Sequence, residues 1–511
     1  MSKLMKRSVC LPLVIVWLVS TLALSGPMGN HGVEAGSAEP APQYCPPGNF
    51  PKLPTSITNV LATPPADVCG TPAQRNMDLF SWLSFIGLNW PASRSTCGPD
   101  TGQSILSGTG PVVWETYLED TDVFVAQGNP SGWCPQGAAA QANLDKRLAT
   151  LPPDLKRVAK QEGIRKFLIA NSKAKLALIQ NFPGIKEAVG GVLTDQNGRF
   201  VRYEIHLNQD EYNYIIDPTN VKTPTNPFPK KNLWSQSGQV GFNDDAHFPL
   251  GQISSQTGLN VRMGAVEIKV AWKVLGQGDD PSRFYTVKGI VYNNAKGARS
   301  PGKNPVLLGL VGLHIMHRTT NQPKWLWSTF EHVDNAPLQG QLNPNAHYNF
   351  YNPKCVNCPL DNTQTAGKNP NELDPHGRPI NRPVQVARVN AIANPPTALN
   401  ETFQNLLKGS VWANYQLVST QWTNELTKPE PGFLANMTLE TYVQGSKPPS
   451  DGPYPYPSPQ YDPFKTYTTT SGQTFYPSSS CLKCHSVATQ NLPNKLPNKK
   501  AGFSFLLGEA Q

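Results

Sequence analysis

The sequence of 511 residues has few charged side chains, no internal repeat and no long apolar run after its first residues. Charged residues make up only 15% of the chain, too few for a coiled coil or a helical solenoid. No stretch of about 20 apolar residues lies inside the chain, so we expect no internal membrane span. Phosphate-binding loops and nucleophile elbows are also missing from the sequence.

Glycine and proline, by contrast, are abundant at 41 and 50 residues, and 38% of the chain is apolar. We therefore expect a true hydrophobic core with many turns, because Gly and Pro interrupt helices and strands. The formal net charge is +9, but the basic residues are scattered along the chain. Scattered charge favours a solvated surface, and we predict no nucleic-acid partner.

The N-terminus has the pattern of an export signal. Lys3, Lys6 and Arg7 precede an apolar run over residues 9–24, and small residues follow it. We interpret residues 1–25 as a signal peptide and predict a periplasmic or secreted protein, which meets a membrane only if the signal is retained as an anchor. Eight cysteines remain after the signal, an even number that favours disulfide bonds in an exported chain.

Hydrophobic periodicity separates a helical region from a β-rich one. Apolar spacings of three and four predict helices over residues 76–90 and 154–181. From about residue 189 the period becomes two, and we expect strands over residues 199–207, 265–275, 284–292, 306–317 and 325–332. Short turns rich in Asn and Gly connect the strands and favour antiparallel pairing.

Residues 481–485 have the most informative pattern in the chain. They read Cys-Leu-Lys-Cys-His, the C-x-x-C-H motif of covalent c-type haem attachment. In such a motif the thiols, here Cys481 and Cys484, bond one edge of the porphyrin, and the adjacent imidazole, here His485, binds the iron as proximal ligand. Random order of this composition would give about 0.003 such matches. We predict one covalent haem c; a local disulfide, half of a zinc site and a redox dithiol are the alternatives.

A second C-x-x-C pair, Cys355 and Cys358, is followed by Pro359. Without a histidine it is no second haem site. We interpret it as a small structural disulfide, with metal binding or dithiol redox activity as alternatives.

The sixth ligand of the iron has to come from upstream, or the distal position is open. Only 26 residues follow His485, and residues 487–511 contain neither His nor Met. The upstream candidates are Met77, Met263, Met316, Met437, His206, His247, His314, His317, His332, His347 and His376. We single out Met437, the nearest in sequence, and His314 and His332 on predicted strands. For each of them an ordinary structural role is the alternative.

Four stretches carry a resemblance to a known group of proteins. They are Phe-Ile-Gly-Leu-Asn-Trp-Pro at 85–91, Gly-Leu-Val-Gly-Leu-His-Ile at 309–315, Trp-Ser-Thr-Phe-Glu-His at 327–332 and Ser-Cys-Leu-Lys-Cys-His-Ser at 480–486. In these stretches the chain resembles an uncharacterised exported bacterial single-haem cytochrome c family, whose haem motif lies near the C-terminus. The resemblance implies haem ligation by Cys481, Cys484 and His485, and it implies no reaction.

The expected fold is α+β, with an antiparallel β-rich central domain, N-terminal helices and a short C-terminal haem-attachment segment. Along the chain we expect a signal peptide (1–25), a Pro-rich N-terminal arm (26–72), a helical region (73–185), a β-rich domain (186–443), a Pro/Ser/Tyr-rich linker (444–480) and a cytochrome c haem-attachment segment (481–511).

Two functions follow from a single haem. The first is one-electron transfer with another exported redox protein as donor or acceptor. The alternative is a c-haem enzyme with an open distal site that acts on peroxide, NO or another small molecule. We favour electron transfer, because no segment presents an identifiable distal Arg and His pair for peroxide chemistry. Catalytic residues are not identifiable, and whether the protein is an enzyme stays open.

Overall fold

The computed structural model describes most of the chain between Leu53 and Ala510. The described residues are 53–70, 73–107, 110–125, 127–164, 166–168, 193–216, 232–242, 244–257, 259–295, 298–355, 358, 385–388, 391–422, 436–439, 467–468, 474–475, 481, 485, 488–493 and 496–510. The expected signal peptide, most of the arm and most of the linker lie outside them. Within these residues, no helix combines the length and apolar character that a membrane crossing needs.

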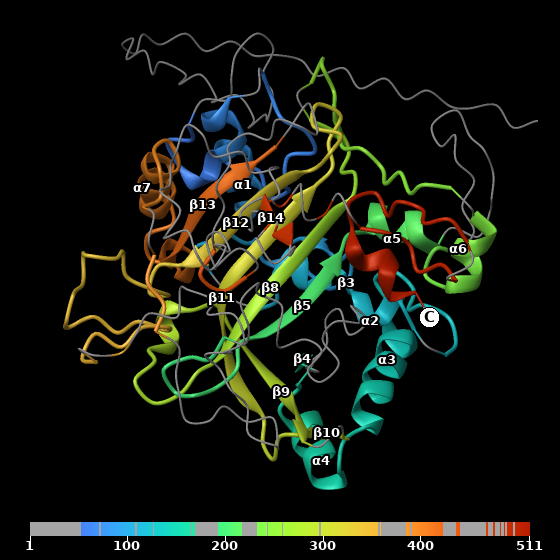
Figure 1. Ribbon diagram of the computed structural model, residues 1–511, viewed down its shortest axis with the longest axis horizontal. Helices are drawn as coiled ribbons and strands as arrows, with labels where there is room; N and C mark the ends of the chain where they lie inside the picture. Colours follow the sequence, from blue (N-terminus) through green and yellow to red (C-terminus); the bar gives the residue numbers. More distant parts are fainter. Residues whose placement is uncertain are drawn as a thin grey trace, which may run out of the picture. The chain divides into compact units, whose positions relative to one another are not determined.

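A nine-stranded sheet forms the centre of the molecule (Figure 1). Its strands are β3 (Leu118–Glu119), β4 (Lys166–Leu168), β5 (Arg202–Leu207), β8 (Val266–Val274), β9 (Thr286–Ala295), β10 (Ala298–Pro301), β11 (Val306–His317), β12 (Leu326–His332) and β13 (Tyr415–Gln421). The main path runs β10-β9-β11-β8-β5-β3, while β12 pairs with β11 and β13. All these pairs are antiparallel except β4 with β9.

Helices and short hairpins surround this sheet. The helices are α1 (Gln74–Leu88), α2 (Asp120–Val123), α3 (Gly137–Ala149), α4 (Pro153–Gln161), α5 (Gln209–Ile216), α6 (Gln236–Phe242) and α7 (Pro396–Leu406), with 3₁₀ turns at Ile57–Asn59, Val113–Thr116, Pro281–Arg283, Val411–Asn414 and Phe505–Glu509. The hairpins are β1 (Ala92–Ser93) with β2 (Gly98–Pro99), β6 (Gln252–Ile253) with β7 (Asn260–Arg262), and β14 (Tyr467–Thr468) with β15 (Thr474–Phe475). The fold is therefore α+β, as expected.

The two faces of the sheet carry different partners. On one face, Phe330 of β12 packs against Trp82 and Phe85 of α1, with ring centroids 5.1 and 4.4 Å apart. Phe403 of α7 stacks on Trp82 at 5.0 Å. We call this the helical face. We call the opposite one, which packs against Ala488, Leu506 and Leu507 near the C-terminus, the C-terminal face. Since side chains alternate along a strand, neighbouring residues of one strand serve different faces.

Other parts of the protein cover both faces of the sheet, so charged side chains on its strands are buried. Every residue of β5, β8 and β12 is buried. The charged residues of these strands therefore lie inside the protein, although an alternating pattern in antiparallel sheets commonly accompanies one solvated face.

Most predicted elements are confirmed. Helix α1 matches the helix expected over 76–90, and β5, β8, β9, β11 and β12 match the five expected strands. The expected helix over 154–181 is wrong in its middle. Helix α4 ends at Gln161, Gly163 follows with a φ of +63°, and Lys166–Leu168 form β4. There Phe167 pairs with Ile290 of β9, and both are buried in one apolar cluster; residues 169–192 lie outside the described chain.

Disulfide bonds join Cys97 to Cys134 and Cys355 to Cys358. The structural-disulfide interpretation of the second C-x-x-C pair is therefore confirmed. Cys69 is disulfide-bonded as well.

Candidate functional site

Cys481 and His485 are the described residues of the C-x-x-C-H motif, and Cys484 lies outside the described chain. Both residues have helical backbone conformation and are half-buried.

The imidazole of His485 is oriented by a backbone carbonyl. Its Nδ1 lies 2.7 Å from the carbonyl oxygen of Phe503. A carbonyl oxygen only accepts hydrogen bonds, so Nδ1 donates the proton and the lone pair of the neutral ring is on Nε2. Metal-binding histidines almost always have their second nitrogen held this way, which fixes the ring and raises its basicity.

The backbone at Phe503 is unusual. Its φ is +71°, in the left-handed region that bulky residues rarely adopt. Such conformations persist only where surrounding contacts hold them, and they concentrate at functional sites. Next to it, the carbonyl oxygen of Gly502 accepts a hydrogen bond of 2.9 Å from Trp325 Nε1. The strained residue is thus the one whose carbonyl holds His485.

Further hydrogen bonds dock the C-terminal segment, which is red in Figure 1 and runs beside α6. The side-chain amide of Gln239 on α6 donates hydrogen bonds to the carbonyl oxygens of Leu233, at 2.7 Å, and Leu507, at 2.8 Å. The Ala246 N–H donates to the Lys500 carbonyl at 3.0 Å. These bonds fix both sides of Phe503.

Two aromatic rings contact His485. The ring centroid of Trp327 on β12 lies 4.5 Å away, and that of Phe505 lies 4.9 Å away. Trp327 belongs to an apolar cluster against which Cys481 and Phe503 also pack. The surroundings of His485 are therefore aromatic and apolar, which suits a large flat prosthetic group.

Strand pairing brings two of the upstream candidates to the same face as Trp327. Met316 of β11 is directly opposite Trp327, and His314 is opposite Thr329, the next residue on that face. Met316 is buried in the cluster of Trp327. His314 and Met316 therefore share the C-terminal face with Trp327, the contact residue of His485.

His332 and Met437 are placed elsewhere. His332 faces the other side of β12, where Nε2 lies 3.0 Å from the Arg283 carbonyl oxygen and Nδ1 accepts the Asp334 N–H at 3.1 Å. Its ring stacks on Phe284 at 4.2 Å. Met437 lies on the same face as Trp327, since its N–H donates to Glu331 Oε2 at 3.0 Å, but it is buried in a different apolar cluster. Neither His332 nor Met437 belongs to the apolar cluster against which Cys481 packs.

Buried carboxylates lie on the C-terminal face next to this site. Glu267 of β8 is opposite Met316, and its Oε2 accepts a hydrogen bond of 2.7 Å from Ser504 Oγ. Burial, and next the charge of Glu267, raises the pKa of Glu211 well above its usual value. Burial and the neighbouring Glu267 carboxylate therefore favour the neutral form of Glu211.

The described residues are of the types that a covalent haem uses: the thiol of Cys481, the imidazole of His485 and the aromatic neighbours Trp327 and Phe505. Sequence reasoning did not find Phe503 and Trp327. Phe503 acts through its backbone, which no side-chain pattern reveals. Trp327 lies on a predicted strand, so the face of the sheet that it occupies could have been inferred from the sequence.

The chain matches no family model, and comparisons with curated proteins and with solved structures find no similar protein. The resemblance to single-haem cytochromes therefore stays a prediction that rests on four short stretches.

Proposed function

We propose that this protein is an exported c-type cytochrome with one haem, bound covalently by Cys481 and Cys484 and ligated by His485, and that it transfers single electrons. The hydrogen bond between His485 Nδ1 and the Phe503 carbonyl carries the proposal, because it prepares Nε2 for a metal. The proposed location is the periplasm or the outside of the cell, and the proposed partner is another exported redox protein.

When bound, haem c supplies an iron that changes its oxidation state by one electron. The residues of this chain have three tasks around it. The Phe503 carbonyl orients the imidazole of His485 and makes it a stronger donor. Trp327 and Phe505 exclude water from one side of the imidazole, and the low polarity they provide helps to set the reduction potential.

The soft sulfur of Met316 and the imidazole of His314 favour a carrier over an enzyme. Both side chains lie on the face that Trp327 shares, and both are ligand types that occupy the sixth position in electron-transfer haems. A filled sixth position leaves no room for peroxide or NO.

The first test uses the full chain, expressed with c-type haem attachment machinery. The intact mass of the purified protein should include one haem, and the double variant C481S/C484S should lose it. The chain offers a matched control in C355S/C358S, which removes the other C-x-x-C pair and should keep the haem. A wild-type protein without added haem mass contradicts the proposal.

The second test distinguishes the carrier from the enzyme by absorption spectra of oxidised and reduced protein, with and without CO. We expect a low-spin spectrum that CO leaves unchanged. Met316→Leu or His314→Asn should make the reduced haem bind CO, whereas Met437→Leu and His332→Asn should not. A high-spin wild-type spectrum that shifts with CO would favour the enzyme acting on peroxide, NO or another small molecule.

A further inference from the structure

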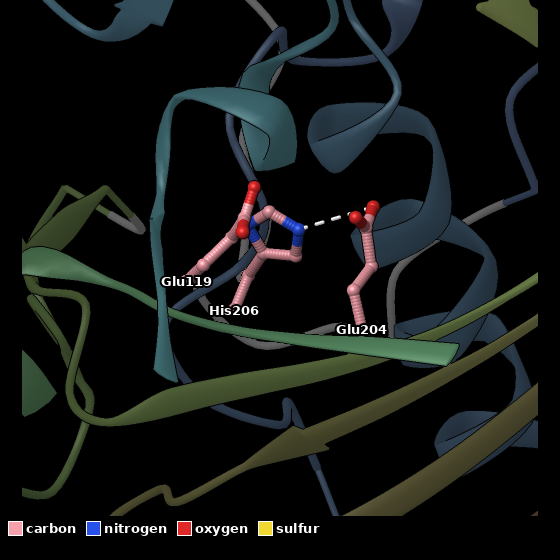
Figure 2. Close-up of side chains that lie close together, drawn as sticks. All are labelled: Glu119, Glu204 and His206. Atoms are coloured by element: carbon pink, nitrogen blue, oxygen red, sulfur yellow. Dashed lines mark ion pairs between the residues drawn. The ribbon is translucent and has the colours of Figure 1, made fainter. Parts of the chain in front are cut away.

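A cluster of two carboxylates and one imidazole lies on the helical face of the sheet, away from the haem motif. Figure 2 shows Glu119, Glu204 and His206, and their candidate ligand atoms all lie within 4.8 Å of one another. Glu119 on β3 is the direct cross-strand partner of His206 on β5, and Glu204 precedes His206 by two residues. Strand pairing and alternation therefore put all three side chains on one face.

The registers of the strands separate this cluster from the haem motif. His206 pairs with Ile268 of β8, and Ile268 pairs with Ile315 of β11. Met316, the next residue on β11, points to the opposite face. The cluster and the side chains around His485 are therefore on different sides of the sheet, so the two can be tested independently.

His206 is prepared as a ligand by the same device as His485. Its Nδ1 lies 3.2 Å from the Tyr117 carbonyl oxygen, so Nδ1 donates and the lone pair of the neutral ring is on Nε2. The residue is only 1% exposed. Nε2 has no partner in hydrogen-bond geometry, although it lies 3.2 Å from Glu204 Oε1. Two lone pairs that face each other inside a protein require a proton or a cation between them.

One carboxylate oxygen of Glu204 is available to bind such a cation. Its Oε1 accepts hydrogen bonds of 2.8 Å from Lys166 Nζ and from Trp272 Nε1. Its Oε2 is buried and has no hydrogen-bond partner. The ammonium group of Lys166, at 2.8 Å, stabilises the charged form of this carboxylate. Glu204 is therefore a carboxylate with an unused, buried oxygen atom.

The charges around the cluster do not balance. Lys166 lies 2.8 Å from Glu204 and 3.7 Å from Glu115. Arg147 lies 3.2 Å from Glu119 and 2.5 Å from Asp122. Within the described part of this cluster four carboxylates thus face two cations. An excess of negative charge in a site of low dielectric is costly, and one divalent cation removes all of it.

We propose that Glu119, Glu204 and His206 bind one divalent cation of the zinc type. Three protein ligands with one imidazole and two carboxylates leave a fourth position for water, the usual arrangement of Zn²⁺ with three ligands. Ligand atoms in a tetrahedral zinc site with bonds of about 2.0–2.2 Å lie about 3.4 Å apart, so atoms up to 4.8 Å apart must approach each other by up to about 1.4 Å. Glu119, whose side chain is 17% exposed, forms the rim by which the cation enters.

The test uses the full protein after treatment with a chelator, with zinc binding measured by calorimetry and metal content by mass spectrometry. We expect one Zn²⁺ per chain at pH 7. His206→Gln and Glu119→Gln should each weaken binding by about 100-fold. Glu119→Gln changes a side chain at the rim, so it stays informative if His206→Gln fails to fold.

The matched control is His347→Gln, which removes another histidine–carboxylate pair. His347 is 49% exposed and lies 3.0 Å from Asp279, outside the cluster, so the variant should bind zinc like the wild type. Calcium should bind far more weakly than zinc, because it prefers oxygen ligands. A wild type that binds no zinc, a variant pair that binds it unchanged, or equal affinity for calcium would overturn the proposal.

Discussion

His485 and His206 are held in the same way and surrounded differently. Each has Nδ1 within hydrogen-bond distance of a backbone carbonyl, at 2.7 and 3.2 Å, so each offers Nε2 to a partner. Around His485 lie the rings of Trp327 and Phe505. Around His206 lie carboxylates, with Glu204 at 3.2 Å.

The difference teaches that the neighbours of an imidazole, more than the imidazole itself, decide what it can bind. An apolar aromatic wall suits a flat prosthetic group whose charge is largely internal. A wall of carboxylates repels such a group and attracts a small cation that neutralises them. The two faces of one sheet thus prepare the same side chain for two kinds of chemistry.

The strongest test of this comparison changes the charge near His206 alone. Lys166→Met leaves Glu204 buried without its cation, and removing one partner of a buried ion pair costs about 3–5 kcal/mol. We expect this loss in the free energy of unfolding, measured by urea titration in zinc-free buffer at pH 7. The spectrum of the proposed haem should stay unchanged, because His485 contacts Trp327 on the other face of the sheet.

The double variant K166M/E204Q serves as the control. It removes both charges, so most of the lost stability should return. A loss below about 1 kcal/mol in Lys166→Met would mean that Glu204 is not held as a buried charge, and the contrast between the two histidines would then fail.

The two sites also differ in how far the sequence reveals them. Cys481 and His485 are four residues apart, so the motif is visible in one short stretch. Glu119 and His206 are far apart in sequence, and only the pairing of β3 with β5 joins them. Periodicity predicted a strand at Glu204 and His206 but not that both faces of it are buried. It also missed β4, whose single pairing with β9 brings Lys166 to Glu204.

A third histidine, His332, is buried like His206 but belongs neither to the haem motif nor to the carboxylate cluster. Burial lowers the pKa of His332 from 6.5 to about 4. The unfolded chain therefore binds a proton between pH 6.5 and 4 that the folded chain does not, so stability falls as the pH falls through this window. The expected loss is about 3 kcal/mol, and below pH 4 this contribution no longer changes.

His332→Phe keeps a ring against Phe284 and removes the titration. The measurement is the free energy of unfolding at several pH values, where the variant should show a shallower slope between pH 6.5 and 4. Equal slopes in His332→Phe and in the wild type would show that His332 is not held neutral.

The smallest effect concerns an exposed ion pair whose N–O distance is close to that of Lys166 and Glu204. Lys288 Nζ lies 3.0 Å from Glu162 Oε2, close to the 2.8 Å of the buried pair, but the side chains are 59% and 39% exposed. Water solvates and screens both charges, so Lys288→Met should change the free energy of unfolding by less than about 0.5 kcal/mol. The same substitution at the same distance then differs several-fold between the two sites. Because the buried pair differs from the exposed one in its burial and its neighbouring charges, that ratio measures how strongly the interior around His206 depends on positive charge. Comparable losses at both positions would assign the effect to the distance within the pairs.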